Sequence, residues 1–107
     1  MKDPNTHAFL NSTTWIKKRE KILKRDGYQC QYFKRYGKKV QANMVHHIFP
    51  RSEYPQYALS DWNLISLSYK AHGQLHTDDG ALTEEGKALL RRTATKNHIE
   101  LPIEFLR

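Results

Sequence analysis

The pattern of apolar positions near the start of the chain predicts a basic amphipathic helix over Trp15–Asp26. Its apolar side chains recur at helical spacing on one side, and lysine and arginine residues occupy the rest. A hydroxyl side chain at one of positions 12–14 is expected to cap the first turn, and Gly27 follows the last turn. The side chains expected to be buried are those of Trp15, Ile16, Ile22 and Leu23.

Two further helices are predicted in the second half of the chain. One covers about Tyr69–Thr77 and ends before the turn at Asp79-Gly80. The other begins after Thr83, where two glutamates suit the positive end of the helix dipole, and reaches about Thr95. The side chains that this last helix is expected to bury are Leu82, Ala88, Leu89 and Leu90.

Extended segments are expected between these helices. The aromatic run Tyr28–Phe33 and the partly β-branched run Val40–His46 are predicted to pair as a hairpin around a turn at Gly37. Arg51–Tyr57 is expected to be a surface loop, and Leu64–Ser68 a short segment that follows a turn. Together these elements predict an α+β fold, in which a two-stranded antiparallel hairpin packs with a helix and is flanked by N-terminal and C-terminal helices.

We expect one domain over residues 1–107, because the sequence has no internal repeat, low-complexity tract or flexible linker. Within it, residues 1–12 are expected to be a loose arm and residues 13–27 the basic helix. Residues 28–77 are expected to be the hairpin-and-helix core, and residues 78–107 the last helix and tail.

Composition narrows the class of protein. The hydrophobic fraction is 38%, which allows only a small core. The sequence has no apolar run long enough to cross a membrane, and its first residues lack the apolar segment of a secretory signal. We therefore expect no membrane partner and a cytoplasmic location. The single cysteine, Cys30, excludes an internal disulfide and a four-cysteine zinc site.

Positive charge is concentrated in the first 40 residues. The chain has 18 Lys and Arg against 11 Asp and Glu residues, a net charge of +7, and residues 1–40 hold eleven of the basic residues but three of the acidic ones. Such a segment is typical of nucleic-acid binding, because lysine and arginine replace the counterions of phosphates. The alternative is a solvated helix face that keeps a small protein soluble, and charge alone leaves both open.

Four of the six histidines form a pattern that suits a metal site. His72 and His76 have the i, i+4 spacing that places two imidazoles on one face of a helix. His46 and His47 are adjacent at the end of a predicted strand, so their side chains point to opposite faces and one of them can join the helical pair. Three imidazoles leave open coordination positions, as catalytic metals require.

Three segments around these histidines resemble the His-Asn-His (HNH) endonucleases, in particular the small stand-alone enzymes of phages and mobile elements. They are residues 45–50 (VHHIFP), 62–67 (WNLISL) and 72–76 (HGQLH), and residues 15–30 match the usual approach to the motif. The resemblance covers about residues 13–77. It implies a ββα-metal (His-Me finger) fold, in which two antiparallel strands and a helix hold one divalent ion.

The resemblance also implies a role for each residue of the motif. His46 and His76 match metal ligands, and His72 matches the additional ligand of relatives whose helix carries two histidines. His47 matches the general base. Asn63 matches the middle residue of the motif, which holds the crossing of strand, loop and helix so that the base keeps its orientation.

Many HNH endonucleases carry two Cys-x-x-Cys pairs that bind a separate structural zinc. The corresponding positions here are Cys30, Phe33, Ser68 and Ala71, so no structural four-cysteine zinc is expected. We expect packing of Phe33 and other aromatic side chains to take the place of the metal bonds, and Cys30 to be a buried, unreactive thiol.

The function implied by the resemblance is metal-dependent hydrolysis of DNA phosphodiester bonds, in which His47 activates water and one divalent ion acts as a Lewis acid. Imidazole ligands suit Zn²⁺, Ni²⁺ or Co²⁺, with Mg²⁺ and Mn²⁺ bound more weakly, and the choice of ion stays open. Arg51 is expected to contact the scissile phosphate. The residues expected to follow the DNA backbone are Lys17, Lys18, Lys21, Lys24 and Arg25.

Low sequence specificity is expected, because the chain has no separate recognition module. A phage-type relative would work with genome-packaging (terminase or portal) proteins, and we expect a monomer or a weak dimer. One alternative is a non-catalytic nucleic-acid-binding module with a structural metal, although the uncommitted His47 argues against it. A second alternative is an interaction domain that binds neither metal nor DNA.

Overall fold

The computed structural model describes residues 6–77 and 81–102. Two single-turn 3₁₀ helices, η1 (Pro55–Tyr57) and η2 (Asp61–Asn63), lie between the strands. The predicted α+β fold with a two-stranded antiparallel sheet is confirmed. The other elements follow in the order α1 (Thr6–Leu10), α2 (Thr13–Arg25), α3 (Gln31–Arg35), β1 (Met44–His47), β2 (Leu64–Leu67), α4 (Tyr69–Leu75) and α5 (Glu84–Lys96).

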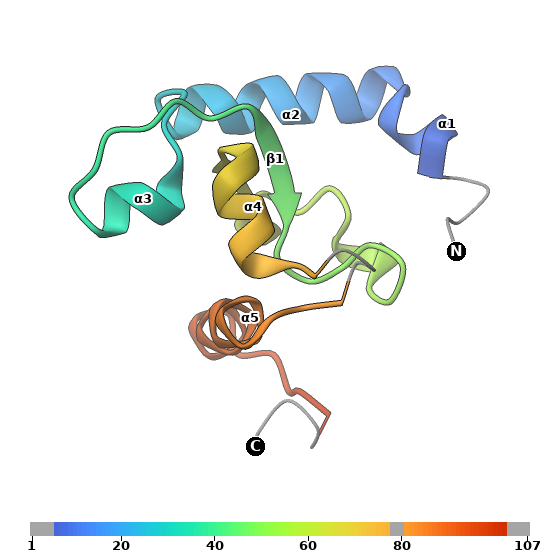
Figure 1. Cartoon of the computed structure of the whole chain (residues 1–107). Helices are drawn as coiled ribbons and strands as arrows, with labels where there is room; N and C mark the ends of the chain where they lie inside the picture. The colour runs from blue at the N-terminus through green and yellow to red at the C-terminus, as the bar shows by residue number, and fades with distance from the viewer. Residues whose placement is uncertain (1–5, 78–80, 103–107) are drawn as a thin grey trace.

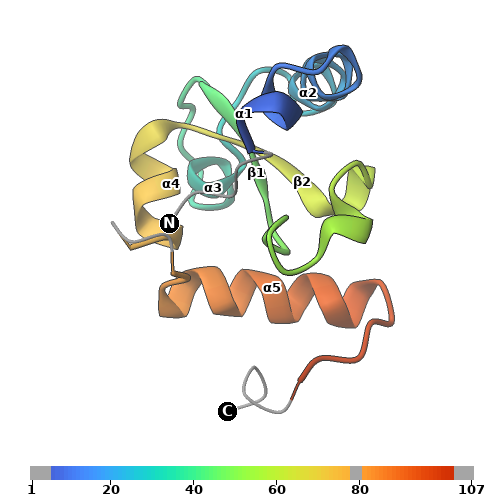
Figure 2. The same cartoon turned by 90° about the vertical axis from the view of Figure 1, so that its right-hand side faces the viewer.

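The sheet and α4 lie between the two longest helices. In Figure 1, α2 runs across one end of the sheet, α5 lies at the opposite end, and α4 lies in front of β1. Figure 2 shows both strands between α2 above and α5 below, with α1 beside α2. Buried side chains form one cluster between α2 and the sheet, a second between α3, β2 and α4, and a third between α5 and the segment that follows β1.

The boundaries of α2 agree closely with those predicted. Its cap is Ser12, whose hydroxyl oxygen accepts a hydrogen bond from the Trp15 backbone N–H at 3.2 Å, and Gly27 follows with φ +63°. Trp15 and Ile22 are buried against the sheet. The prediction that Ile16 is buried is wrong, because the buried stripe passes through positions 15 and 22 and leaves Ile16 44% exposed.

The strand pairing differs from the predicted hairpin. β1 pairs with β2, in a register that places Met44 opposite Leu67 and His47 opposite Leu64. The prediction that residues 28–33 and 40–46 pair as a hairpin is wrong. The two segments are joined by one isolated bridge, between Gln29 and Gln41. The segment after η2, expected to be merely extended, is therefore the second strand of the sheet.

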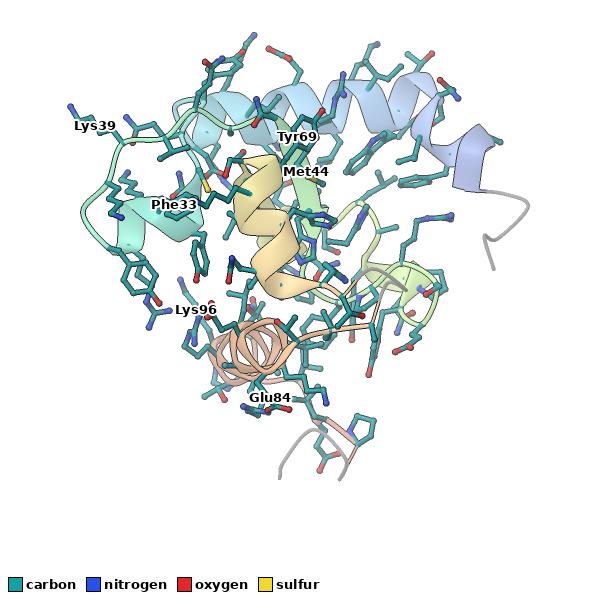
Figure 3. The ribbon with its side chains drawn as sticks, in the orientation of Figure 1. Phe33, Lys39, Met44, Tyr69, Glu84 and Lys96 are labelled. Carbon is teal, nitrogen blue, oxygen red and sulfur yellow. The ribbon has the colours of Figure 1, made fainter. Side chains whose placement is uncertain are left out.

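The aromatic run after Cys30 forms α3 instead of a strand. Tyr32 and Tyr36 contact each other at helical spacing, with 5.4 Å between ring centroids. Phe33 is directed from α3 toward α4 and packs on the cluster there (Figure 3). Aromatic residues are common in strands, but here their three- and four-residue spacing matters more, because it places them on one face of a helix.

The N-terminal segment is more ordered than the predicted loose arm. Residues 6–10 form α1, and the ring of Phe9 lies 5.2 Å from that of Trp15 between centroids. This aromatic contact holds α1 against α2. Residues 1–5 lie outside the described part of the chain.

α4 and α5 are joined by a close contact at their ends. α4 ends at Leu75, earlier than the predicted Thr77, and the predicted turn at Asp79-Gly80 lies outside the described residues. A Cβ on Gly86 would collide with the carbonyl oxygen of Leu75, so the close approach requires glycine. The predicted Thr83 cap accepts a hydrogen bond from the Gly86 N–H at 3.1 Å. α5 buries Leu90, as predicted, together with Thr93 and Ala94. The prediction is wrong for Leu82, which precedes α5, and for Ala88 and Leu89, because all three are half-buried at the edge of the contact.

Within the described ranges, every helix is too short or too polar to span a lipid bilayer.

Candidate functional site

Three imidazoles converge between β1 and the C-terminal end of α4. His46 lies on β1 and is 4% exposed, His72 lies in the last turn of α4, and His76 is the first residue after that helix. The ring centroids are 4.7 to 5.3 Å apart. One nitrogen of each ring lies within 4.8 Å of the other two. The fold thus brings together the three predicted ligands from two distant segments.

The spacing of these nitrogens fits one divalent ion. Metal–imidazole bonds of about 2.0–2.1 Å place neighbouring ligand nitrogens about 3.0–3.4 Å apart, and His46 Nδ1 lies 3.3 Å from His76 Nε2. Burial lowers the pKa of His46 well below its usual range, and the other imidazoles lower it further. Burial and the nearby His76 also lower the pKa of His72. The cluster therefore favours neutral imidazoles, which is the form that binds a metal.

His47 lies on the opposite face of β1 and has different neighbours. Its ring stacks on Trp15, with 4.9 Å between centroids and 22° between planes, and its Nε2 lies 3.0 Å from the Ala58 carbonyl oxygen. Because a carbonyl accepts hydrogen bonds and cannot donate them, Nε2 carries the proton of the neutral ring and Nδ1 keeps the free lone pair. Burial lowers the pKa of His47, and the charge of Arg51 lowers it further against the opposing effect of the Ala58 hydrogen bond.

Asn63 is fully buried and fastens the loop between the two strands. Its Oδ1 accepts a hydrogen bond from the Phe49 N–H at 2.6 Å. Its Nδ2 donates to the carbonyl oxygens of Phe49 at 3.2 Å and Tyr57 at 3.0 Å. Tyr57 directly precedes Ala58, whose carbonyl bonds to His47. Asn63 is therefore connected to the His47 ring through the loop backbone.

Arg51 and the four motif histidines line one cavity of about 280 Å³. The guanidinium carbon of Arg51 lies 4.5 Å from the centroid of the Phe9 ring, which is cation–π geometry. A guanidinium binds a phosphate through paired N–H donors, and imidazoles can hold a cation beside it. The arrangement can thus bind a phosphodiester, hold a divalent ion and accept a proton within one cavity.

Three contacts of His47 and Arg51 come from residues that the motif does not include. They are the rings of Phe9 and Trp15 and the carbonyl of Ala58. A backbone carbonyl carries no sequence signal, and Trp15 is predicted only as a core residue. The available signal for Phe9 was the apolar run just before the Ser12 cap, because a hydrophobic residue there often packs against the helix that follows.

The five basic residues of α2 that were predicted to follow DNA have two kinds of surroundings. Lys18 and Lys21 form ion pairs with Asp61 at 2.5 and 2.8 Å. Arg25 donates hydrogen bonds to the backbone carbonyls of Asp61 and Leu64. These three side chains tie α2 to η2 and β2. The remaining two, Lys17 and Lys24, are exposed.

The four positions that the resemblance matches to a structural zinc site lie close together. Cys30 and Ala71 are fully buried in one cluster, and Phe33 packs against it. The Ser68 hydroxyl lies 3.6 Å from the Cys30 sulfur. The four corresponding positions therefore still meet in space, as the predicted replacement of metal bonds by packing requires.

Among solved structures, the chain is similar to the HNH endonuclease of the deep-sea thermophilic bacteriophage GVE2, crystallised with a manganese ion. The two structures superpose with a TM-score of 0.63 and 26% sequence identity, over 88% of this chain and 84% of the phage chain. The chain has the fold of an HNH endonuclease. The resemblance that the motif residues indicated is thereby confirmed.

No family model matches the chain, and no curated protein matches it. The HNH assignment consequently depends on the structural likeness together with the histidine and asparagine motif. The likeness supports a nuclease function, and His46, His72 and His76 can hold a metal ion.

Proposed function

We propose that the chain is a divalent-metal-dependent DNA endonuclease that hydrolyses phosphodiester bonds by a one-metal mechanism. The observation that carries this proposal is the cavity where His46, His72 and His76 converge and His47 stands apart with its own hydrogen-bond partner. A divalent ion on the three imidazoles would supply Lewis-acid stabilisation of the charge that develops on the phosphate. His46 and His76 thus have catalytic roles as ligands, and His72 completes the set.

His47 is the general base in this proposal. Its Nδ1 removes a proton from water, while Nε2–H keeps its hydrogen bond to the Ala58 carbonyl and so stabilises the imidazolium that forms. General-base help of this kind contributes about 10²–10⁴ in rate. The stack on Trp15 and the loop fastened by Asn63 hold the ring in one orientation, so the base does not have to be ordered during the reaction.

The substrate contacts follow from the charges around the cavity. Arg51 binds the scissile phosphate, and the Phe9 ring under its guanidinium restricts the positions that it can take. Lys17 and Lys24 project from α2 and contact the DNA backbone beyond the cavity. Lys18, Lys21 and Arg25 contribute to the same basic helix, and the ion pair of Lys21 with Asp61 is exposed and exchanges readily for phosphate.

The proposal also covers the metal ion, the reaction products, the sequence specificity and the partners. Mg²⁺, Mn²⁺, Ni²⁺ and Zn²⁺ are the ions to compare, with Mn²⁺ first because the similar phage enzyme was crystallised with it. We propose products with 5′-phosphate and 3′-hydroxyl ends, low sequence specificity, and a single domain that acts as a monomer or weak dimer. A role with phage packaging proteins is proposed from the HNH likeness alone.

A plasmid-nicking assay tests the proposal. Supercoiled plasmid is incubated with the protein and each of the four ions, and a chelator is added in parallel. We expect relaxed circles in at least one ion and none with chelator. His47→Ala should reduce nicking by about 10²–10⁴ while Mn²⁺ still binds.

The matched control is His98→Asn, which changes an exposed histidine outside the motif. His98 has φ +57°, a conformation that asparagine tolerates better than alanine. This variant should nick at the rate of the unaltered protein. An unaltered protein that binds DNA and metal but nicks with no ion would overturn the proposal in favour of a non-catalytic binding module.

A further inference from the structure

A groove lies across α4 from the histidine cavity. It runs between α3, β2 and α5 as two adjoining hollows of about 180 and 500 Å³, which share Gln31, Ile65 and Arg92. Leu75 of α4 lines this groove, whereas the next residue, His76, lines the histidine cavity. Among the described residues, none lines both this groove and the histidine cavity. We refer to these two hollows together as the α3–α5 groove.

Three cations of the α3–α5 groove are available to a ligand. They are Arg35 of α3 and Arg92 and Lys96 of α5, for which the described residues supply no hydrogen-bond or ion-pair partner. A fourth cation, Arg25, is already engaged with backbone carbonyls. The four cations that line the groove thus outnumber its two carboxylates, those of Asp26 and Glu85, and the groove keeps an excess of positive charge.

The acidic residues that line the groove are engaged by other residues of the groove. Glu85 accepts a hydrogen bond from the Tyr32 hydroxyl at 2.5 Å, and this raises the pKa of Tyr32 to about 12. Asp26 pairs with Arg25 at 2.9 Å and accepts a hydrogen bond from the Ser66 N–H. Neither carboxylate forms an ion pair with the three available cations within the described part of the chain.

The available cations repel one another in the free protein. Arg92 and Lys96 have the i, i+4 spacing on α5 at which like charges destabilise a helix. Burial lowers the pKa of Arg92, and the charge of Arg35 lowers it further, while Tyr36 acts in the opposite direction. An anion bound between these side chains removes the repulsion, so the groove favours an anionic ligand.

An exposed aromatic ring narrows the class of anion. Tyr36 is 62% exposed and lines the groove beside Arg35. Nucleobases of an unpaired strand stack on such rings, whereas the bases of a duplex are stacked on one another and cannot reach them. Phosphate-binding cations beside an exposed ring are the combination found in sites for single-stranded nucleic acid.

We propose that the α3–α5 groove binds one unpaired strand of DNA, with its phosphates against Arg35, Arg92 and Lys96 and a base on Tyr36. The strand held there is a different segment from the one at the histidines, because α4 separates the two sites. The groove requires neither the metal nor His47, so its binding is independent of the proposed hydrolysis.

Fluorescence anisotropy in the presence of chelator tests this site without cleavage. The probes are a labelled single-stranded 20-mer and the corresponding duplex, each measured over a range of salt. Arg35→Gln/Arg92→Gln should weaken binding of the single strand about tenfold and reduce the slope of log affinity against log salt by about 1.4, the value for two phosphate contacts. Tyr36→Ala should weaken it about tenfold, and Tyr36→Phe should restore it.

The matched control is Lys38→Gln/Lys39→Gln, which removes the same charge from exposed lysines that do not line the groove. Lys39 points away from the body of the molecule in Figure 3. Binding of the single strand should fall less than threefold in this control. The proposal is overturned if both double variants lose the same affinity and slope, or if the duplex loses as much as the single strand. Plasmid nicking is measured in a separate assay, so a protein that fails to nick DNA can still confirm or overturn the binding of single strands by this groove.

Discussion

The two faces of β1 place the same side chain in different surroundings. His46 points toward α4, where two further imidazoles approach within 4.8 Å of its nitrogen. His47, the next residue, points toward α2, where it stacks on an indole ring and bonds to a carbonyl. Because both residues are histidines, the difference between them comes from their neighbours and not from their chemistry.

One short strand thus places two histidines in surroundings that suit different tasks. On the His46 face, lone pairs of several rings converge, and a cation is the group that complements them. On the His47 face, a single acceptor fixes the proton on Nε2 and leaves the lone pair of Nδ1 for the proposed role as general base. A strand is suited to this separation, because adjacent side chains on it diverge whereas i, i+4 side chains on a helix meet.

The largest expected effect is on metal binding, which should depend on His46 and not on His47. His46→Ala removes one of three imidazoles and is expected to weaken Mn²⁺ binding by more than about a hundredfold, because changes even outside the ligand set cost about 10–100-fold. His47→Ala should leave Mn²⁺ binding within about twofold of the unaltered protein. Titration calorimetry near neutral pH measures both. Equal losses in the two variants would contradict the separation of tasks.

The second prediction concerns the residue that fastens the loop under His47. Asn63→Ala removes the hydrogen-bond partner of two buried backbone groups of Phe49 and of the part-buried Tyr57 carbonyl, and should lower the free energy of unfolding by about 2–4 kcal/mol. Urea unfolding measures this loss. Asn43→Ala is the control. The exposed Asn43 side chain accepts a hydrogen bond of 3.3 Å from the Tyr69 N–H, and its loss should cost less than about 1 kcal/mol.

The fold was predictable where the signals are local. The Ser12 and Thr83 caps and the apolar spacing of α2 and α5 lie within a few residues of the structures that they specify. The pairing of β1 with β2 was not predictable in this way, because its hydrogen bonds join residues 44–47 to 64–67. The aromatic run after Cys30 was predicted as a strand because of its composition, whereas its helical spacing lets it pack as α3 on the cluster that β2 and α4 form.

The residue types of the site could be predicted from the sequence, but most of the contacts that hold those residues in place could not. The spacing of His72 and His76 and the adjacency of His46 and His47 follow from helix and strand periodicity, although His76 lies just beyond the end of α4. The partners of the basic helix were missed, because the pairing of Lys18 with Asp61 joins positions 43 residues apart. Sequence identifies the candidate groups for the reaction, whereas contacts between distant segments decide how these groups are held.

The third prediction concerns the Phe9 ring, which lies beside both His47 and Arg51. Phe9→Leu keeps an apolar side chain under Arg51 but removes the ring that attracts its charge. Because exposed cation–π contacts contribute about 0.5–1 kcal/mol, kcat/KM for nicking should fall about two- to fivefold. Phe9→Tyr should restore it. In an Arg51→Gln background Phe9→Leu should have no further effect, and additive losses would contradict a role that acts through Arg51.

The smallest expected effect concerns the ion pairs that hold α2, and with it Trp15, against η2. Hydrogen bonds from Lys18 and Lys21 lower the pKa of Asp61 to about 2, below the value of about 3.9 in an unfolded chain. The folded state therefore gains stability from this carboxylate above about pH 4 and loses it as the pH falls toward about 2. The Asp61 side chain is 43% exposed, so solvent and salt screen the pairs and the gain should stay below about 1 kcal/mol.

Asp61→Asn isolates this effect from the titration of the histidines, which is common to both proteins. Urea unfolding should show the variant less stable at neutral pH, with a difference that shrinks as the pH falls and vanishes below about pH 2, since the protonated carboxyl and the amide are both uncharged there. Added salt should reduce the difference at neutral pH. A difference that stays constant over this range would show that Asp61 acts through packing, and that ion pairs do not hold the face of the molecule on which His47 lies.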